Sequence, residues 1–155
     1  MVSVRIATGA EQPINRHAGL SSYEGEEGDL VGLDASGNVV QADADSGVAV
    51  PALGVMLSPV DNPANYSVPE VADIITANRT VAGEHRVTFI RHGIEMENSD
   101  DDWNFTPGGR VYLAEGGGFT QTAPSDTGDL VQVVGVALTD ERIALDVSID
   151  YEVSA

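Results

Sequence analysis

"GGRVYLAEGGGFTQTAPSDTGDLVQVVGVAL", Gly108 to Leu138, repeats a plan already used in "GDLVGLDASGNVVQADADSGVAVPALGVML", Gly28 to Leu57. Each stretch begins with glycine and a short alternating strand, "LVGLD" or "RVYLA", and continues into a glycine-containing turn, "ASGN" or "EGGG". Glycine supplies the positive φ that a tight hairpin requires. After a second short strand and a polar loop, each stretch closes on "GVML" or "GVAL". The sequence therefore predicts a β-hairpin plus a third strand, written twice.

Identical residues at matching places support this repeat. The offset is 80 at first and becomes 81 after one inserted residue, and the identical pairs are Gly28/Gly108, Val31/Val111, Leu33/Leu113, Gly37/Gly117, Gln41/Gln121, Gly47/Gly128, Gly54/Gly135, Val55/Val136 and Leu57/Leu138. A unit this small exposes one apolar face and is marginal alone, so we expect the two units to bury each other's faces. The prediction is an all-β fold, a small β-barrel or β-sandwich.

Other segments fit the same fold class. Residues 2–8, "VSVRIAT", and 85–91, "HRVTFIR", are rich in β-branched and aromatic residues, which predicts strands. The stretch 142–150, "RIALDVSID", has the clearest alternation of a half-buried strand. Its predicted buried face holds Ile143, Leu145, Val147 and Ile149.

One segment has helical rather than strand periodicity. In "SVPEVADIITAN", residues 67–78, Ser67 is a possible cap, and Val71, Ile74 and Ile75 share one helical face. We expect one short helix within an insertion, residues 62–80, that separates the two repeat units, residues 28–57 and 108–138. The predicted domain organisation is an N-terminal strand or arm, residues 1–23, followed by a single β domain, residues 24–155.

The charge of the chain is strongly negative. Its 155 residues include 25 acids against seven basic residues, all arginine, for a formal net charge of −18. Such a surface repels nucleic acid, whose phosphates must be neutralised by basic side chains. A disordered acidic tail is disfavoured, because the 42% of hydrophobic residues spread along the chain. An acidic surface matched to a basic partner remains open, and adaptation to concentrated salt is favoured, because salt screens self-repulsion.

The N-terminal segment differs from the rest in charge. Residues 1–23 contain Arg5 and Arg16 with Glu11 as the only acid, a formal +1. Two interpretations stay open: an edge strand followed by a loop, or an arm that docks on an acidic neighbour. The chain has no cysteine and no window of about 18 apolar residues, so we expect no disulfide, no thiolate metal site and no membrane span.

Three motifs carry possible chemistry. "FIRHGIE", residues 89–95, resembles the phosphohistidine motif of histidine phosphatases, but the α/β pattern of that family is missing, and we expect Arg91 and His92 to be surface residues at a strand end. "NSDDDWN", residues 98–104, offers Asp100, Asp101 and Asp102 as weak ligands for a hard cation, although a solvated acidic loop is favoured. Trp103 is expected to cover the end of a barrel, with ligand binding as the alternative.

Sequons make Asn65 and Asn78 possible N-glycosylation acceptors, and a third, at Asn104, is disfavoured by Pro107. No serine–histidine–acid order, phosphate-binding glycine loop or metal triad stands out. We therefore expect no enzymatic activity, no cofactor and no resident metal.

The ordered pattern "GDLVGLDASGNVVQA…ALGVML…GEHRVTFIRHGI…TPGGRVYLAEGGGFTQTAP…VQVVGVALTDERIALDV" resembles the capsid cement, or head decoration, proteins of tailed viruses. The resemblance covers residues 24–147, interrupted by the insertion. It implies a small β-barrel or β-sandwich that binds the major capsid protein on the outer surface of an assembled shell, as a trimer. The acidity, the missing lysine and the helical insertion depart from the family and suggest a virus of a halophilic archaeon.

Under this interpretation the N-terminal segment, or apolar strand edges, supply the capsid contacts. We expect Arg5, Ile6, Arg16 and His17 to face the shell, because this segment is the least acidic part of the chain. The alternative function is a head fibre or spike module that binds a host receptor or glycan through the insertion and the Trp103 loop.

The charge yields a prediction about salt. Self-repulsion at −18 acts over about 30 Å in 0.01 M salt and over about 3 Å in 1 M salt. Transfer from multimolar to millimolar salt is therefore expected to lower the melting temperature, measured by circular dichroism. A melting temperature that does not change over this range contradicts adaptation to salt.

Overall fold

The computed structural model describes residues 4–8, 25–57, 89–98 and 102–155, and of residues 4–8 it describes the backbone alone. The described residues form twelve strands and no helix, which confirms the predicted all-β class. The insertion 62–80, its expected helix at 67–78 and most of the arm lie outside the described residues.

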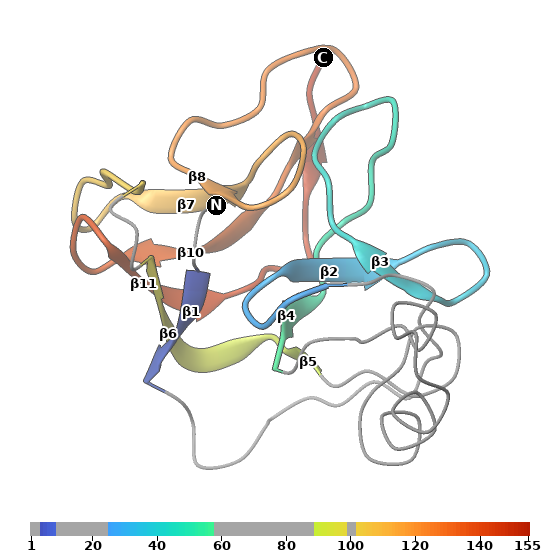
Figure 1. The fold of residues 1–155 in the computed structure, drawn as a ribbon. Helices are drawn as coiled ribbons and strands as arrows, with labels where there is room; N and C mark the ends of the chain where they lie inside the picture. The colour runs from blue at the N-terminus through green and yellow to red at the C-terminus, as the bar shows by residue number, and fades with distance from the viewer. Residues whose placement is uncertain (1–3, 9–24, 58–88, 99–101) are drawn as a thin grey trace, which may run out of the picture.

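The larger sheet has six strands and curls into a half-barrel (Figure 1). Neighbours along it are antiparallel throughout. Its order is β1 (Val4–Thr8), β6 (His92–Asn98), β11 (Arg142–Asp146), β10 (Val133–Ala137), β7 (Arg110–Leu113) and β8 (Phe119–Thr120). The N-terminal strand β1 is thus an edge strand of this sheet, paired with β6.

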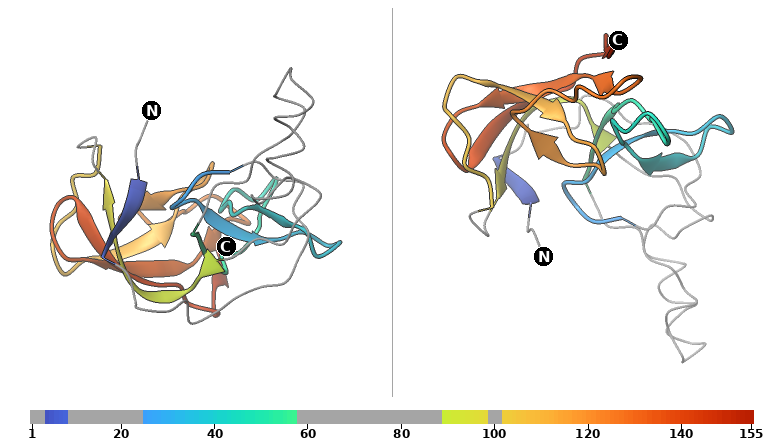
Figure 2. Two further views of the ribbon diagram at one scale, coloured as in Figure 1. Left: turned by 60° about the horizontal axis from the view of Figure 1, so that its bottom comes forward. Right: turned by 90° about the horizontal axis from the view of Figure 1, so that it is seen from above.

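A four-stranded sheet lies beside it, and a two-stranded ribbon ends the chain (Figure 2). The four-stranded sheet has the order β3 (Val39–Gln41), β2 (Leu30–Leu33), β4 (Gly54–Met56) and β5 (Phe89–Ile90). The ribbon pairs β12 (Glu152–Val153) with β9 (Leu130–Val131).

The predicted repeat is present as the same strand order in both sheets. In the first unit β2 pairs with β3 and β4, and β4 pairs with β5. In the second unit β7 pairs with β8 and β10, and β10 pairs with β11. The hairpin turns match bond for bond. Asp34 donates its N–H to Asn38 and accepts from Gly37, and Ala114 donates to Gly118 and accepts from Gly117.

One kind of turn opens strands β2, β7 and β9. In each case a glycine with a φ between 83° and 95° precedes the strand and donates its N–H to a carbonyl of the segment that pairs with that strand. The three bonds run from Gly28 to Met56 (2.9 Å), from Gly108 to Ala137 (2.8 Å) and from Gly128 to Ser154 (2.9 Å). The third use of the turn, at Gly128, lies inside the second repeat unit and starts the terminal ribbon.

A single apolar core connects the two units. Leu30 and Val55 from the first unit and Val111 and Val134 from the second belong to one buried cluster. The four-stranded sheet is buried on its other face as well, where a smaller cluster forms from Val31, Val39, Met56 and Phe89. Because both units contribute to the larger cluster, each covers the apolar face that the other would expose.

Backbone and side-chain hydrogen bonds cross the same junction. Ala44 donates its N–H to Ala114 and accepts from Leu130. The buried amide of Gln132 accepts from the N–H of Ala52 at 2.7 Å and donates to the carbonyl of Ala52 at 2.8 Å. These bonds fix how the second unit sits on the first.

Two local predictions need correction. Ile149 is not on the buried face of its strand but 65% exposed. The strand β11 ends at Asp146 because Val147 and Ser148 donate their N–H groups to Arg91 and Val133 instead, and the chain then turns outward. Arg91 is also not a simple surface residue: it is half-buried, and its guanidinium donates to the Val147 carbonyl at 3.1 Å.

The glycines that begin "GVML" and "GVAL" have the same steric role. A Cβ added at Gly54 would lie 2.5 Å from the Ile90 carbonyl oxygen, and one at Gly135 would lie 2.5 Å from that of Ala144. In both cases the oxygen belongs to the neighbouring strand: β5, which pairs with the strand of Gly54, and β11, which pairs with the strand of Gly135. Close strand approach, rather than a turn, therefore selects glycine here.

We expect Gly54→Ala and Gly135→Ala each to destabilise the fold by about 1–3 kcal/mol, because the backbone oxygen must move. Gly47→Ala is the matched control, since the nearest atom to its Cβ is a side-chain oxygen of exposed Asp45 at 3.3 Å. That control should stay within about 0.5 kcal/mol of wild type. Denaturant unfolding measures all three, and equal losses at all three glycines would contradict the close-approach explanation.

Candidate interaction surface

The outward face of the six-stranded sheet is where apolar and basic side chains meet in the described part of the chain. Along β6, β7 and β11, buried residues such as Val111 and Ile143 alternate with residues that face out. We name the following set the outer sheet face: Glu95, Glu97, Arg110, Tyr112, Val133, Val136, Leu138, Arg142, Ala144 and Asp146. Its two arginines offset two of its three acids, which leaves a formal −1 in a chain with a net charge of −18.

Strand register orders this face into rows. One row crosses four strands through Arg110, Val136, Ala144 and Glu95. In a second row Arg142 lies opposite Glu97, and β1 places Arg5 at the position opposite Glu97 on the other side. The predicted contact residue Arg5 therefore holds a position at the edge of the outer sheet face, whereas Ile6 holds the position opposite buried Met96.

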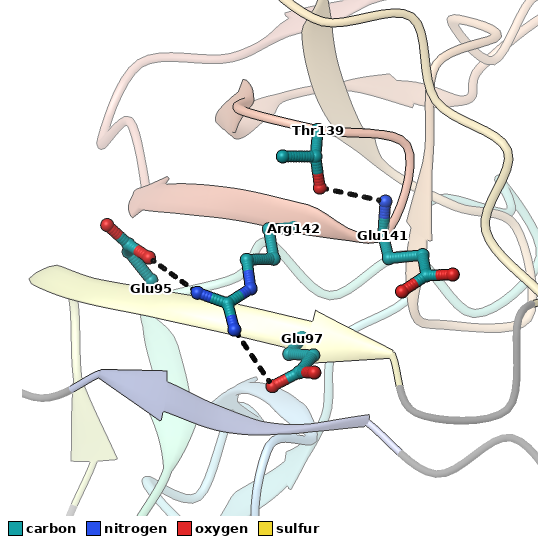
Figure 3. A network of polar contacts seen from close by, with 5 residues as sticks. All are labelled: Glu95, Glu97, Thr139, Glu141 and Arg142. Carbon is teal, nitrogen blue, oxygen red and sulfur yellow. Dashed lines mark hydrogen bonds and ion pairs between the residues drawn. The ribbon is translucent and has the colours of Figure 1, made fainter.

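Arg142 lies between the two glutamates of this face (Figure 3). Its guanidinium nitrogens lie 3.6 Å from one carboxylate oxygen of Glu95 and 3.6 Å from one of Glu97. The side chain of Arg142 is 41% exposed, so these ion pairs neutralise charge more than they stabilise the fold. The turn before β11 is held by the Thr139 hydroxyl, which accepts the Glu141 N–H at 3.2 Å.

Large apolar side chains are exposed on and beside this face. Val136 and Leu138 lie on β10 and just after it, and Ile149, Tyr151 and Val153 follow alternately along the C-terminal segment. A groove of about 340 Å³ runs between the sheet and that segment. Arg110, Tyr112, Val131, Val133 and Tyr151 line it together with the acids Asp150 and Glu152. Tyrosine and arginine around an apolar centre are typical of protein–protein interfaces.

An acidic cluster lies at the junction of the two units. Carboxylate oxygens of Glu115, Asp126 and Asp129 come within 4.8 Å of one another, close enough to act together as ligands of a hard cation. Asp129 is buried and accepts the N–H groups of Ser46 at 3.1 Å and Asp126 at 3.0 Å. Asp102, from the predicted weak cation loop, is exposed and is not part of this cluster.

Two carboxyl groups in the described residues have clearly shifted pKa values. Asp129 beside Glu115 raises the pKa of Glu115 from its ordinary value of 4.5 through repulsion and a shared hydrogen bond, and Asp126 and Asp45 add to the effect. The N–H groups of Asn38 and Ser36 lower the pKa of Asp34 in the first hairpin turn by donating to its carboxylate.

Of the other site residues predicted from the sequence, some lie within the described residues and some do not. Arg16, His17, Asn65, Asn78, Asp100 and Asp101 lie outside the described residues. His92 begins β6 and is half-buried. Trp103 is only 8% exposed and packs against Phe105 and Phe119, with ring centroids 5.0 and 5.3 Å away. Its expected place at the end of a barrel stays a prediction.

Sequence reasoning missed the acidic cluster and the groove. Glu115 is separated from Asp126 and Asp129 by a strand and a loop, so their meeting depends on the fold. One signal was available: the tetrapeptide "GDLV" occurs at 28–31 and again at 128–131. Asp29 and Asp129 both accept an N–H from three residues earlier, Glu26 or Asp126. This literal repeat marks the third turn and the ribbon that borders the groove.

Comparison with known proteins gives one informative result. No protein-family model matches the chain, and no curated protein sequence matches it. Among solved structures, the fold is similar to that of a protein from Mycobacterium phage Patience, with a TM-score of 0.56 and 11% sequence identity over 98% of this chain and 99% of that one. The shared property is the fold. No helix in the described ranges is long and apolar enough to span a bilayer.

We expect Glu115→Gln to raise the melting temperature at neutral pH in low salt, because it removes a charge repelled by Asp129 and Asp126. A raised carboxyl pKa means that the folded state binds the proton more tightly, so stability is present below the ordinary pKa and is lost as pH rises through the raised pKa. The gain should therefore disappear below pH 4.5 and shrink in concentrated salt.

Glu152→Gln is the control, because it removes one charge from an exposed position in β12. Melting curves of both variants between acidic and neutral pH test the prediction. Equal shifts for Glu115→Gln and Glu152→Gln would show a general charge effect rather than a local one.

Proposed function

We propose that this chain is a virion protein that binds the major capsid protein on the outer surface of an assembled capsid and stabilises the shell. The observation that carries the proposal is the outer sheet face, where exposed apolar residues and two arginines meet three acids, a formal −1 on a molecule with a net charge of −18. The fold shared with a phage protein over nearly the whole chain supports the same conclusion.

The mechanism is thermodynamic and needs no catalysis. A protein that binds only the assembled shell shifts the equilibrium towards assembly by mass action. A trimer would contact several shell subunits at once, so weak individual contacts sum to durable attachment. The outer sheet face supplies the apolar area for each contact, and the acidic junction of the two units stays in solvent. Arg5 adds a contact at the edge of this face, and Ile6, Arg16 and His17 are the other proposed contacts of the N-terminal segment.

The net negative charge of the chain also has a role under this proposal. In the concentrated salt of a halophilic host, the charge of −18 is screened and hydrated rather than repulsive. Copies can therefore lie close together on a shell while the outward surface stays soluble. A virus of a halophilic archaeon is the source that this charge pattern supports.

The test is attachment of purified protein to undecorated capsids, measured by co-sedimentation and electron microscopy. Wild type should bind at saturating occupancy and raise the disassembly temperature of the shell. Val136→Asp with Leu138→Asp should weaken binding at least about tenfold, because two exposed apolar contacts become charged. Val48→Asp is the control, since Val48 is also exposed but lies in the loop between β3 and β4, away from the outer sheet face.

The N-terminal contacts need a different variant. Removal of residues 1–23 would delete β1, an edge strand of the six-stranded sheet, so it would confound folding with binding. Arg16→Ala with His17→Ala leaves β1 intact and should reduce attachment. Binding to host cells without binding to capsids would overturn the proposal and favour a receptor-binding module of a head fibre or spike.

A further inference from the structure

A cavity of about 390 Å³ lies between the two repeat units, away from the outer sheet face. The turn before β2, the end of β3 and the turn between β7 and β8 form its walls, together with Trp103. Its volume is in the range of small-ligand sites in proteins. Glycines of these turns also line the cavity, so part of its wall is backbone rather than side chain.

The charge of the lining is of one sign. Glu26, Glu27, Asp29 and Asp102 supply four carboxylates, and none of the described residues that line the cavity is basic. Asp29 is held in place because its carboxylate accepts the Glu26 N–H at 2.9 Å. The cavity therefore favours a positively charged occupant by charge complementarity.

The other wall is aromatic. Trp103 and Phe119 both line the cavity, with ring centroids 5.3 Å apart and planes at 70°. Trp103 is fixed from behind by stacking on Phe105. A cation near an indole ring gains attraction from the ring quadrupole. Of the protein cations, guanidinium is planar, weakly hydrated and able to stack on a ring while it donates to carboxylates, whereas an ammonium group is compact and strongly hydrated.

We propose that this cavity binds an arginine side chain presented by a protein partner. Glu26, Glu27 and Asp102 are exposed, so the cavity is open on the carboxylate side. A small free cation would remain half in water there, whereas a partner that carries the side chain covers the opening with its own surface. The inference goes beyond capsid attachment, because it concerns a separate surface and does not require the partner to be a shell protein.

The single tryptophan of the chain makes the test direct, because Trp103 lines the cavity and is the only indole fluorophore. The probe is a blocked tripeptide with a central arginine, titrated at the lowest salt concentration at which the protein is folded. We expect a saturable change in tryptophan emission. The same peptide with citrulline, which has the shape of arginine without its charge, should bind about tenfold more weakly.

Two double variants form a matched pair. Glu27→Gln with Asp102→Asn removes two carboxylates from the cavity and should weaken the binding of the arginine peptide about tenfold. Asp150→Asn with Glu152→Gln removes two carboxylates from the groove on the other face and should leave binding within about twofold of wild type. Circular dichroism verifies that both remain folded, and the citrulline comparison on wild type is independent of any variant.

Several results would overturn the proposal: equal binding of the citrulline peptide, no saturable emission change, or wild-type affinity in the cavity variant. Methylguanidinium that binds as tightly as the peptide would assign the cavity to free small cations instead of a partner's side chain. None of these measurements involves a capsid, so their failure is separate from a failure of the attachment assay.

Discussion

The side-chain amide of Gln132 lies between the two repeat units, and the arrangement of the whole molecule depends on the contacts around it. It exchanges two hydrogen bonds with the backbone of Ala52 and donates a third to the Ser148 carbonyl at 2.7 Å. A buried polar group left without a partner costs about 1–3 kcal/mol, so these bonds strongly favour one register of the second unit on the first. The shared apolar core supplies the attraction, and the amide supplies the specificity.

The sequence could predict those parts of the fold that depend on residues close together in the chain. Gly37 and Gly117 mark equivalent hairpin turns, and Gly54 and Gly135 mark equivalent close approaches between strands, because both requirements act on a single residue. Ile149 shows the limit. Its alternation continued the pattern of β11, but long-range bonds from Val147 and Ser148 ended the strand. Local periodicity carries no information about such partners.

The candidate sites were less predictable for the same reason. The acidic cluster joins Glu115 to residues of a later turn, and the cavity beside Trp103 has walls from both units. Neither grouping exists in any short window of sequence. The charge pairing on the outer sheet face likewise follows from strand register, which brings Arg142 next to Glu95 and Glu97. Composition gives the total charge of a chain, whereas only the fold gives its distribution.

That distribution explains why one chain can be both strongly acidic and adhesive. Carboxylates gather at the junction of the two units, where Glu115 and Asp129 repel one another and weaken the fold at low salt. The outer sheet face holds the exposed pair Val136 and Leu138 beside the ion pairs of Arg142 with Glu95 and Glu97, so burial there gains apolar contact next to acids that are already paired. High salt screens the repulsion between carboxylates at the junction of the two units, and it strengthens apolar contact at the outer sheet face. The same solvent condition would therefore favour both a stable fold and its attachment to a partner.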